Sequence, residues 1–408
     1  MGVTTARRDR VPILALLTAN VISQTGSTLT GVAVPWFVLV TTGSAAKTGL
    51  TGAAALLPVV LAGVFGGTLV DRVGLRRMSV VADLCSGVAV ALIPIFYHTT
   101  GLAFWELLVL LFLGELCANP GGTARTALVP ELAEQGNLSL ERANAALGAA
   151  LNMSGLLGPV LAGVLIVAVG ADNVLFLDAG SFAISAGLVA LLVPAVAATQ
   201  DAAQERPSYL TELREGLHLL RLDRVLLPLF LAAAVVNFTV VPLVAVVLPV
   251  YARQVLGSAF ELGAILSAIG AGTLIGTIAY GILAQRLPRY HTLLGALLAF
   301  ALLLTGLVLL PGFAITLLLL GVAGLTVGPI NPMIETMIQR RVPLELRGRI
   351  FGLLMAFASG ISPLGIVIGG LLLQYTSLRL SVGLVTGLLL AVAVGLWFVP
   401  SLRQLKTA

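Results

Sequence analysis

Carboxylates that interrupt long apolar runs are the residues of this sequence best suited to chemistry. Glu115 lies near the middle of one run, Asp83 near the start of another, and Asp178 about a turn and a half inside a third. Burial in an apolar medium favours the neutral form of a carboxyl group, so such a group can take up and release a proton. We predict proton-coupling roles for Glu115, Asp178 and Asp83. The alternatives are a structural hydrogen bond for Glu115, pairing with loop arginines for Asp83, and helix capping or packing for Asp178.

Amide and aromatic side chains within other apolar runs could hold a small molecule. Asn20 and Gln24 share one helix face at a spacing of four residues, and Asn237 occupies a similar depth in the second half of the chain. With the carboxylate, such amides would line a sparsely polar cavity that suits a bulky, amphipathic ligand, cationic or neutral, better than a sugar. Each amide could equally join two helices by hydrogen bonds. The predicted substrate-binding residues are Asn20, Gln24, Trp36, Glu115, Asn237 and Phe238.

Histidine and cysteine are too sparse for a metal site or a disulfide framework. His98, His218 and His291 lie far apart near the ends of apolar runs, and Cys85 and Cys117 lie inside such runs. Cysteines of this kind usually pack as small hydrophobic residues. We therefore predict no metal, no cofactor and no catalytic site, and the chain is not expected to be an enzyme.

The elements that hold these residues are predicted to be membrane-spanning helices. Of the 408 residues, 58% are hydrophobic and 10% are charged, and the mean hydropathy is +1.06. A soluble domain is about 25% charged, and a helix needs about 20 apolar residues to cross a bilayer. Twelve runs meet this length, near 12–40, 48–70, 78–98, 102–124, 142–169, 173–197, 225–251, 259–285, 291–311, 313–338, 348–374 and 379–400. The predicted fold class is an all-α polytopic membrane protein with twelve transmembrane helices.

Positive charges alternate between the two ends of these runs. If the N-terminus is cytoplasmic, 20 of the 23 Lys and Arg residues face the cytoplasm, including Arg125 and Arg142 in the region between the fourth and fifth runs. The three on the other side are Lys47, Arg253 and Arg379. This asymmetry follows the positive-inside rule. It predicts a multi-pass protein of the inner (cytoplasmic) cell membrane with both termini cytoplasmic, and it explains the net charge of +5 without a nucleic-acid partner.

The two halves of the chain repeat short motifs at a nearly constant offset. Asn119-Pro120, which is predicted to end the fourth span, recurs as Asn331-Pro332 at the end of the tenth, at an offset of 212 residues. Parallel repeats of six helices place a substrate site at their interface. We predict an N-terminal six-helix bundle at 1–197, a cytoplasmic linker with an interfacial helix at 198–223, and a C-terminal six-helix bundle at 224–408.

The loop after the second run combines glycine, aspartate and arginine. Its pattern resembles the most specific signature of the major facilitator superfamily, with Leu75 at a position that is usually basic. The resemblance implies two six-helix bundles that alternate access, and a latch in which Asp71 faces the N-terminus of the span near 348–374. The alternative is that the arginines only set topology. The predicted latch residues are Gly67, Asp71, Arg72, Gly74, Arg76 and Arg77.

The fifth run carries small residues around a proline, namely Gly158, Pro159 and Gly163. They resemble the antiporter motif of drug:proton exporters, and an equal alternative is that they only allow close helix packing. The arginine that such exporters carry deep in their fourth span is missing, because Arg125 lies at least one helical turn too late. Over the whole chain, the sequence is most similar to the macrolide-efflux and enterobactin-exporter branch of the superfamily.

The residues and the resemblance together predict a secondary transporter, driven by a gradient because the chain shows no nucleotide-binding domain. The expected activity is proton-coupled efflux of hydrophobic or amphipathic drugs such as antibiotics, and the resemblance implies a monomer. Export of a siderophore or movement of a lysolipid is the alternative within transport. A membrane receptor or sensor that binds without transport is the alternative of another class, which the latch motif disfavours.

Overall fold

The computed structural model describes residues 10–194, 220, 223, 225–342 and 344–406. At positions 60, 62–72, 344–345, 348–349 and 404–406 it describes the backbone only. The backbone of these residues is helical and contains no strand. Two compact units are present, Met1–Phe37 with Ala54–Asp201, and Val38–Ala53 with Ala202–Ala408. The interfacial helix predicted within 198–223 falls almost wholly outside the described residues.

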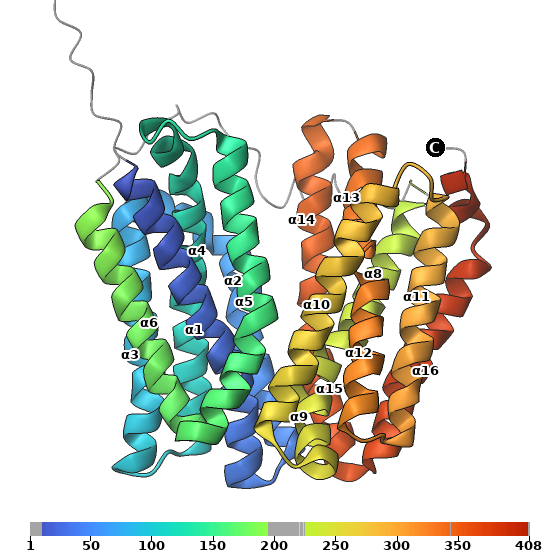
Figure 1. The fold of residues 1–408 in the computed structure, drawn as a ribbon, viewed down its shortest axis with the longest axis horizontal. Helices are drawn as coiled ribbons and strands as arrows, with labels where there is room; N and C mark the ends of the chain where they lie inside the picture. Colours follow the sequence, from blue (N-terminus) through green and yellow to red (C-terminus); the bar gives the residue numbers. More distant parts are fainter. Residues whose placement is uncertain (1–9, 195–219, 221–222, 224, 343, 407–408) are drawn as a thin grey trace, which may run out of the picture. The chain divides into compact units, whose positions relative to one another are not determined.

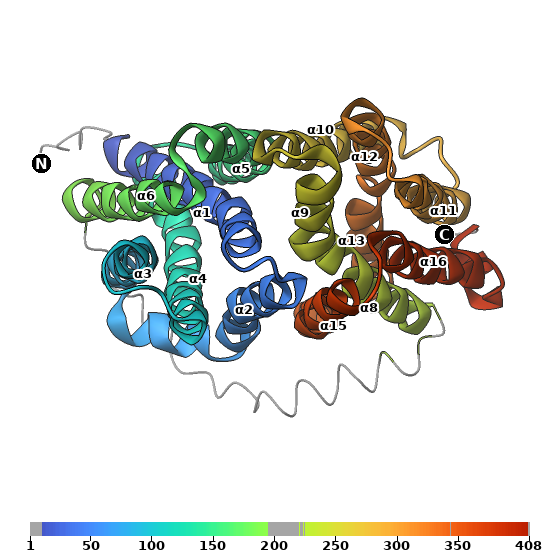
Figure 2. The ribbon, with the colours of Figure 1, turned by 90° about the horizontal axis from the view of Figure 1, so that it is seen from below.

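The first unit is a bundle of long helices that run side by side (Figure 1). It is built from α1 (Val11–Thr42), α2 (Ala45–Val73), α3 (Leu75–His98), α4 (Phe104–Gln135), α5 (Leu140–Val169) and α6 (Ala171–Leu192), of which the end of α1 and the start of α2 belong to the second unit. α3 packs against both α4 and α6 (Figure 2). Leu16 of α1, Leu128 of α4 and Val189 of α6 are at most 1% exposed and belong to one apolar cluster. This apolar packing joins α1, α4 and α6 in one bundle.

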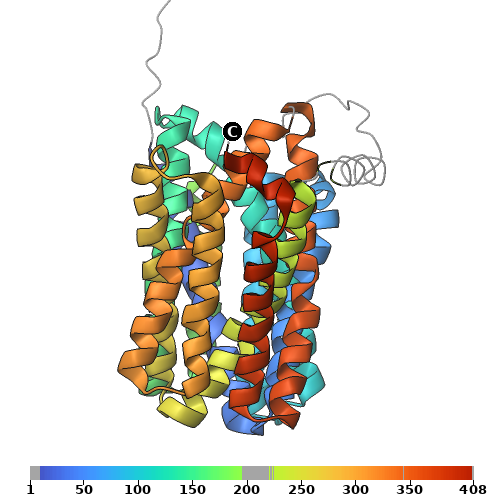
Figure 3. The ribbon, with the colours of Figure 1, turned by 90° about the vertical axis from the view of Figure 1, so that its right-hand side faces the viewer.

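The second unit contains shorter and more interrupted helices. They are α8 (Leu226–Pro242), η1 (Leu243–Val247), α9 (Leu248–Tyr251), η2 (Ala252–Leu256), α10 (Ala259–Leu283), α11 (Arg289–Thr305), η3 (Gly306–Leu309), α12 (Phe313–Val327), α13 (Ile330–Arg341), α14 (Leu344–Gly360), α15 (Ser362–Tyr375), α16 (Leu378–Trp397) and η4 (Pro400–Lys406). α11 packs against both α12 and α16 (Figure 3).

Breaks occur where the sequence predicts single spans. α12 and α13 are separated by Gly328-Pro329, and Pro363 follows directly on the break between α14 and α15. Pro242 ends α8, and the π-helical turn η1 follows it. Proline lacks the N–H that an α-helix requires and crowds the preceding turn, so a break or a wider turn relieves the clash. Within a membrane, neighbouring helices can satisfy the backbone groups that are released.

Ten helical segments in the described residues are long and apolar enough to cross a membrane. They run from Leu75–His98 to Leu378–Trp397, so the difference from the predicted twelve lies in α1 and α2. α1 carries Asn20, Gln24 and Ser27 in its middle, which lowers its hydropathy, and part of α2 has no described side chains. The chain is a multi-pass helical membrane protein.

Glycines allow two helices of the second unit to approach closely. A Cβ atom added at Gly272 of α10 would lie 2.0 Å from the carbonyl oxygen of Gly321 in α12, and one at Gly324 would lie 2.3 Å from that of Ile269. No side chain fits at either position, because real Cβ atoms are essentially never found so close to a backbone oxygen. Small residues drive helix association in membranes by permitting such packing.

The fourth helix differs from its prediction. α4 begins at Phe104 and ends at Gln135, well beyond the end predicted at 124, with Pro120 and Pro130 inside it. Asn119-Pro120 therefore does not end the span. Polar side chains form hydrogen bonds along this part of the helix, from Asn119 to the Glu115 carbonyl at 2.8 Å and from Thr123 to the Asn119 carbonyl at 3.1 Å. The expectation that Arg125 lies in the loop after this span is wrong.

Candidate substrate and proton site in the first unit

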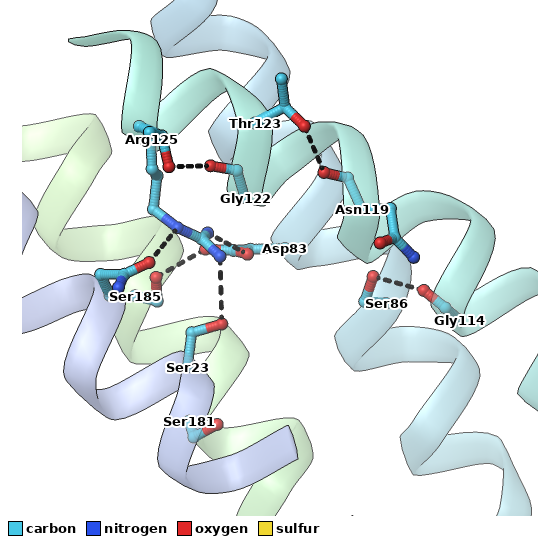
Figure 4. Close-up of polar contacts among 12 residues, drawn as sticks. Ser23, Asp83, Ser86, Gly114, Asn119, Gly122, Thr123, Arg125, Ser181 and Ser185 are labelled. Carbon is cyan, nitrogen blue, oxygen red and sulfur yellow. Dashed lines mark hydrogen bonds and ion pairs between the residues drawn. The ribbon is translucent and has the colours of Figure 1, made fainter. Parts of the chain in front are cut away.

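Arg125 is the centre of a buried polar network in the first unit. Its side chain is 4% exposed, and Nη1 lies 2.6 Å from Oδ1 of Asp83, which is fully buried. Arg125 Nε donates to Asn20 Oδ1 at 3.3 Å, and Nη2 donates to Ser23 Oγ at 3.4 Å (Figure 4). Ser185 donates to the other carboxylate oxygen of Asp83 at 2.6 Å. Side chains of α1, α3, α4 and α6 thus meet around one ion pair.

The network gives Asp83 a partner that differs from the expected one. Asp83 was predicted either to carry a proton or to pair with a loop arginine, and its partner is the helix residue Arg125. Removing one member of a buried pair leaves an uncompensated charge, at a cost of about 3–5 kcal/mol. The pair therefore constrains how α3 and α4 pack.

Asp178 is a second buried carboxylate, 1% exposed, at the contact between α6 and α1. Thr30 donates to Oδ2 at 2.5 Å, and Ser181 donates to Oδ1 at 3.2 Å. A Cβ atom at Gly26 would lie 2.4 Å from Oδ1, so glycine is required where α1 passes this carboxylate. Among the described residues, Asp178 accepts from neutral hydroxyl groups and forms no ion pair.

Glu115 lines a cavity of about 290 Å³ within the first unit. The side chain is half-buried, and it lies close enough to Asp178 for the two carboxyl groups to interact electrostatically. The cavity is lined by Ser23, Gln24, Ser27, Glu115, Ala118, Asn119, Gly122, Thr123, Arg125 and Phe182. This lining combines one carboxyl group with amides, hydroxyls and an aromatic ring, and its guanidinium is already paired with Asp83.

The structure places the predicted binding residues in different surroundings. Gln24 and Glu115 line the cavity, and Asn20 lies beside it with its amide oxygen occupied by Arg125. Trp36 is half-buried near the other end of α1. Two further predicted residues lie on α8 of the second unit.

In the second unit, the two predicted residues on α8 have different partners. Asn237 donates to the Ala233 carbonyl of its own helix at 2.9 Å. Phe238 lines an apolar pocket of about 170 Å³ between α8, α15 and α16, together with Pro242 and Gly369. Asn237 thus has a local hydrogen bond, and Phe238 has apolar surroundings.

Three of the predicted latch residues, Gly74, Arg76 and Arg77, have described surroundings. Gly74 has a φ of +86° immediately before α3, a conformation that favours glycine. Arg76 donates to the Ala190 carbonyl of α6, and Arg77 is exposed. The side chains of Asp71 and Arg72, and the surroundings of Gly67, lie outside the description.

The small residues of α5 meet α1. Gly158, Pro159 and Gly163 are buried, and a Cβ atom at Gly158 would lie 2.6 Å from Cγ2 of Thr28. Ser154, one turn earlier, shares a hydrogen bond of 3.1 Å with Thr25. These positions allow close packing of the two helices, which leaves the coupling role of the motif a prediction.

Histidines and cysteines form no metal site in the part of the chain that the structure describes, where no three potential ligands gather. Nε2 of His98 lies 2.8 Å from Oδ2 of Asp172. His218 falls outside the described residues.

The residues that sequence reasoning missed are Arg125, Ser185 and Ser23. Arg125 was assigned to a loop because Asn119-Pro120 was taken as the end of a span. One signal pointed to a partner: Asp83 lies inside an apolar run, and a buried carboxylate needs a cation or several donors. The serines have no sequence signal, because single hydroxyls are common in membrane helices.

Comparison with known proteins decides the family. The model of the Major Facilitator Superfamily matches residues 16–270 and 243–407. The chain belongs to the major facilitator superfamily. The predicted family is thereby confirmed, and the protein is a membrane transporter and not an enzyme.

Relatives within the superfamily include named efflux proteins. The multidrug efflux pump Tap of Mycobacterium tuberculosis is 34% identical, over 98% of this chain and 96% of the relative. Tap of Mycolicibacterium fortuitum is 31% identical over 98% of each chain. Macrolide efflux protein A of Streptococcus pyogenes is 23% identical over 86% of each. The predicted similarity to macrolide-efflux proteins is borne out.

Solved structures of the superfamily share the fold. The crystal structure of the nucleoside transporter NupG has a TM-score of 0.77 and 12% identity, covering 95% of this chain and 98% of that one. A bacterial homologue of the lysosomal transporter Spinster has a TM-score of 0.72 and 15% identity, covering 99% of both chains. At these identities the likeness concerns the fold alone.

Proposed function

We propose that this superfamily member is a multidrug efflux transporter that exports amphipathic cationic drugs in exchange for protons. The observation that carries the proposal is Glu115, a carboxyl group on the wall of a cavity inside a membrane-spanning bundle. A carboxylate inside a membrane is energetically costly, so its presence there points to a function. The names of the relatives, multidrug efflux pump and macrolide efflux protein, support a drug as cargo.

The chemistry rests on competition for one negative charge. A proton or the cationic group of a drug can neutralise Glu115, and both cannot do so together. A proton that arrives from the acidic side displaces the drug, and loss of that proton on the other side restores drug binding. Phe182 offers an aromatic face to the drug, and Gln24 and Asn119 offer hydrogen bonds. Asp178, close to Glu115, is the second proposed proton site.

The cavity favours a cation over an anionic siderophore. Its lining has one carboxyl group, and the guanidinium of Arg125 is already bound to Asp83. An anion would meet an unpaired carboxylate and no free cation among the described lining residues. A lysolipid with a choline or ethanolamine headgroup is a test substrate for the same cavity, because that headgroup carries a positive charge beside its phosphate.

The wider mechanism follows the superfamily pattern. We propose twelve spans in two six-helix bundles, near 1–197 and 224–408, joined by a cytoplasmic linker. The protein works as a monomer in the cytoplasmic membrane with both termini inside the cell. Gly67, Asp71, Arg72, Gly74, Arg76 and Arg77 form the latch of one transport state. Gly158, Pro159 and Gly163 let α5 move closely against α1.

The substitution Glu115→Gln tests the proposal, because glutamine resembles the protonated carboxyl group in size and charge. In proteoliposomes with an imposed pH gradient, we expect the accumulation of a lipophilic cationic drug to fall about tenfold or more. The matched control is Glu106→Gln, because Glu106 lies on the same helix and accepts a hydrogen bond from the Ala103 N–H at its end, 2.9 Å away. Unchanged pH-driven efflux by the Glu115 variant would overturn the proposal.

A further inference from the structure

Buried hydroxyl and carboxyl groups form a line on one face of α6. Asp178, Ser181 and Ser185 follow one another at helical spacing and are 1%, 9% and 0% exposed. Ser181 donates to Asp178 at 3.2 Å, and Ser185 donates to Asp83 at 2.6 Å. A hydroxyl group can accept one proton while it passes on its own, so such a line can conduct protons. The step from Ser181 to Ser185 spans one helical turn, roughly 6 Å, which one water molecule can bridge.

The line begins beside the drug cavity. Asp178 interacts electrostatically with Glu115, and Phe182, the neighbour of Ser181, lines the cavity. The inference therefore rests on the proposed function, because it treats Glu115 and Asp178 as sites that receive protons. A proton bound to Glu115 or Asp178 could pass to the hydroxyl groups of α6 without any movement of drug. The proton gradient would then be dissipated without export.

The other end of the line meets the ion pair. Both oxygens of Asp83 are occupied, one by Arg125 and one by Ser185. Asn20 and Ser23 hold the guanidinium in place, and all of these side chains are more than nine-tenths buried. Arginine keeps its proton in proteins. A proton that reaches Ser185 therefore faces a fixed positive charge, and protonation of Asp83 would leave that charge unpaired in an apolar site.

We propose that the Arg125–Asp83 ion pair is a barrier that stops protons from leaving the cavity through the interior of the first unit. Beyond the pair lies Ser79, one helical turn from Asp83 on the same face of α3. Ser79 is fully buried, and its hydroxyl has no hydrogen-bond partner among the described residues. Such groups are rare. Ser79 lies toward the start of α3, so the pair separates the hydroxyl groups of α6 from the buried hydroxyl group of Ser79.

Among the described side chains, few charged or titratable groups face the pair. Asp178 on α6 interacts electrostatically with Asp83, and Glu115 on α4 shares the cavity lining with Arg125. α1 contributes the neutral side chains of Asn20 and Ser23. A fixed cation therefore stands between the proton-binding carboxyl groups and Ser79, and fixed charges of this kind exclude protons from pores.

The experiment uses the full-length protein in liposomes without drug, with a pH-sensitive dye inside and the membrane potential clamped. The double variant Asp83→Asn with Arg125→Gln removes both charges and keeps a polar side chain at each position. We expect proton entry about tenfold faster than for the wild type. Adding Ser185→Ala should restore the slow rate because it cuts the line. Adding Ser86→Ala should not, since Ser86 donates to the Gly114 carbonyl outside the line.

Two results would overturn the proposal. One is proton entry at the wild-type rate through the folded double variant, and the other is equal suppression of the proton leak by Ser86→Ala and Ser185→Ala. Unspecific damage to the bundle would not distinguish the two serines. Wild-type drug-stimulated proton exchange, measured in the same liposomes, tests the proposed function separately. A leak in the double variant without such exchange would support the barrier and refute proton-coupled efflux.

The single variant Arg125→Lys gives a second test, which keeps a cation beside Asp83. This test does not require the double variant to fold. A buried lysine can lose its proton, whereas arginine does not. Proton leak through this variant should rise with pH as the lysine loses its proton, whereas the wild-type leak should stay flat over the same range. A flat profile in the lysine variant would contradict the proposal.

Discussion

Arg125 of α4 and Asp83 of α3 face each other in the interior of the first unit, with 2.6 Å between Nη1 and Oδ1. The pair lies 42 residues apart in sequence and reaches α1 through Asn20 and α6 through Ser185. Four helices thus depend on one charge pair for their relative positions. The cavity that contains Glu115 lies against the same arginine, so packing and site geometry are linked.

Removal of one partner of the pair should destabilise the protein more than removal of both. Asp83→Leu or Arg125→Met alone leaves a lone buried charge, at a cost of about 3–5 kcal/mol. The double variant Asp83→Leu with Arg125→Met replaces the pair by apolar side chains and should recover much of this loss. Unfolding in mixed micelles, followed by circular dichroism, measures the difference. Additive losses would contradict the pairing.

Binding of a cationic drug should weaken as the pH falls. The anionic form of Glu115 attracts the cation, and protonation removes that attraction, so affinity is present at high pH and is lost at low pH. One proton competes with one cation, which limits the change to about tenfold per pH unit. Glu115→Gln should bind weakly at every pH. Fluorescence titration in detergent measures this, with Glu106→Gln as the control; identical pH profiles for Glu115→Gln and the wild type would refute the competition.

Gly158→Ala should disturb the contact between α5 and α1. The added Cβ would lie 2.6 Å from Cγ2 of Thr28, and overpacking of this kind costs about 1–3 kcal/mol. Thr28→Ala in the same protein removes that methyl group but leaves the Cβ atom 2.9 Å away, so it should restore part of the lost stability and transport. Gly155→Ala is the matched control, because no atom lies within 4 Å of its added Cβ. Thermal unfolding in detergent tests the prediction, which fails if both alanine variants behave alike.

Gly272→Ala should be more damaging than a neighbouring substitution on the same helix. Its Cβ would lie 2.0 Å from the Gly321 carbonyl oxygen, and backbone cannot move aside as a side chain can. We expect α10 and α12 to separate, with a large loss of folded protein. Gly281→Ala, also on α10, has open space around the added atom. Yield of monodisperse protein after size-exclusion chromatography compares the two, and equal yields would argue against the close approach.

Much of the first unit's chemistry was accessible from sequence. Glu115 was found because a carboxylate in the middle of an apolar run is conspicuous, and Gln24 because it lies four residues from Asn20. Proline misled the prediction of α4. An Asn-Pro pair usually suggests a helix end, whereas in a membrane bundle the helix can continue through it. That one boundary moved Arg125 from a loop into the interior.

The sequence by itself determined that the chain forms apolar helices for a bilayer, which helix motifs it carries and to which superfamily it belongs, since these depend on local composition and spacing. Tertiary structure alone decided which polar groups meet. Asp83, Arg125 and Ser185 come from three helices, and their contact depends on the rotation and register of each helix in the bundle. Those quantities follow from side-chain packing over the whole unit, as at Gly26 and Gly158, and no local pattern in the sequence encodes them.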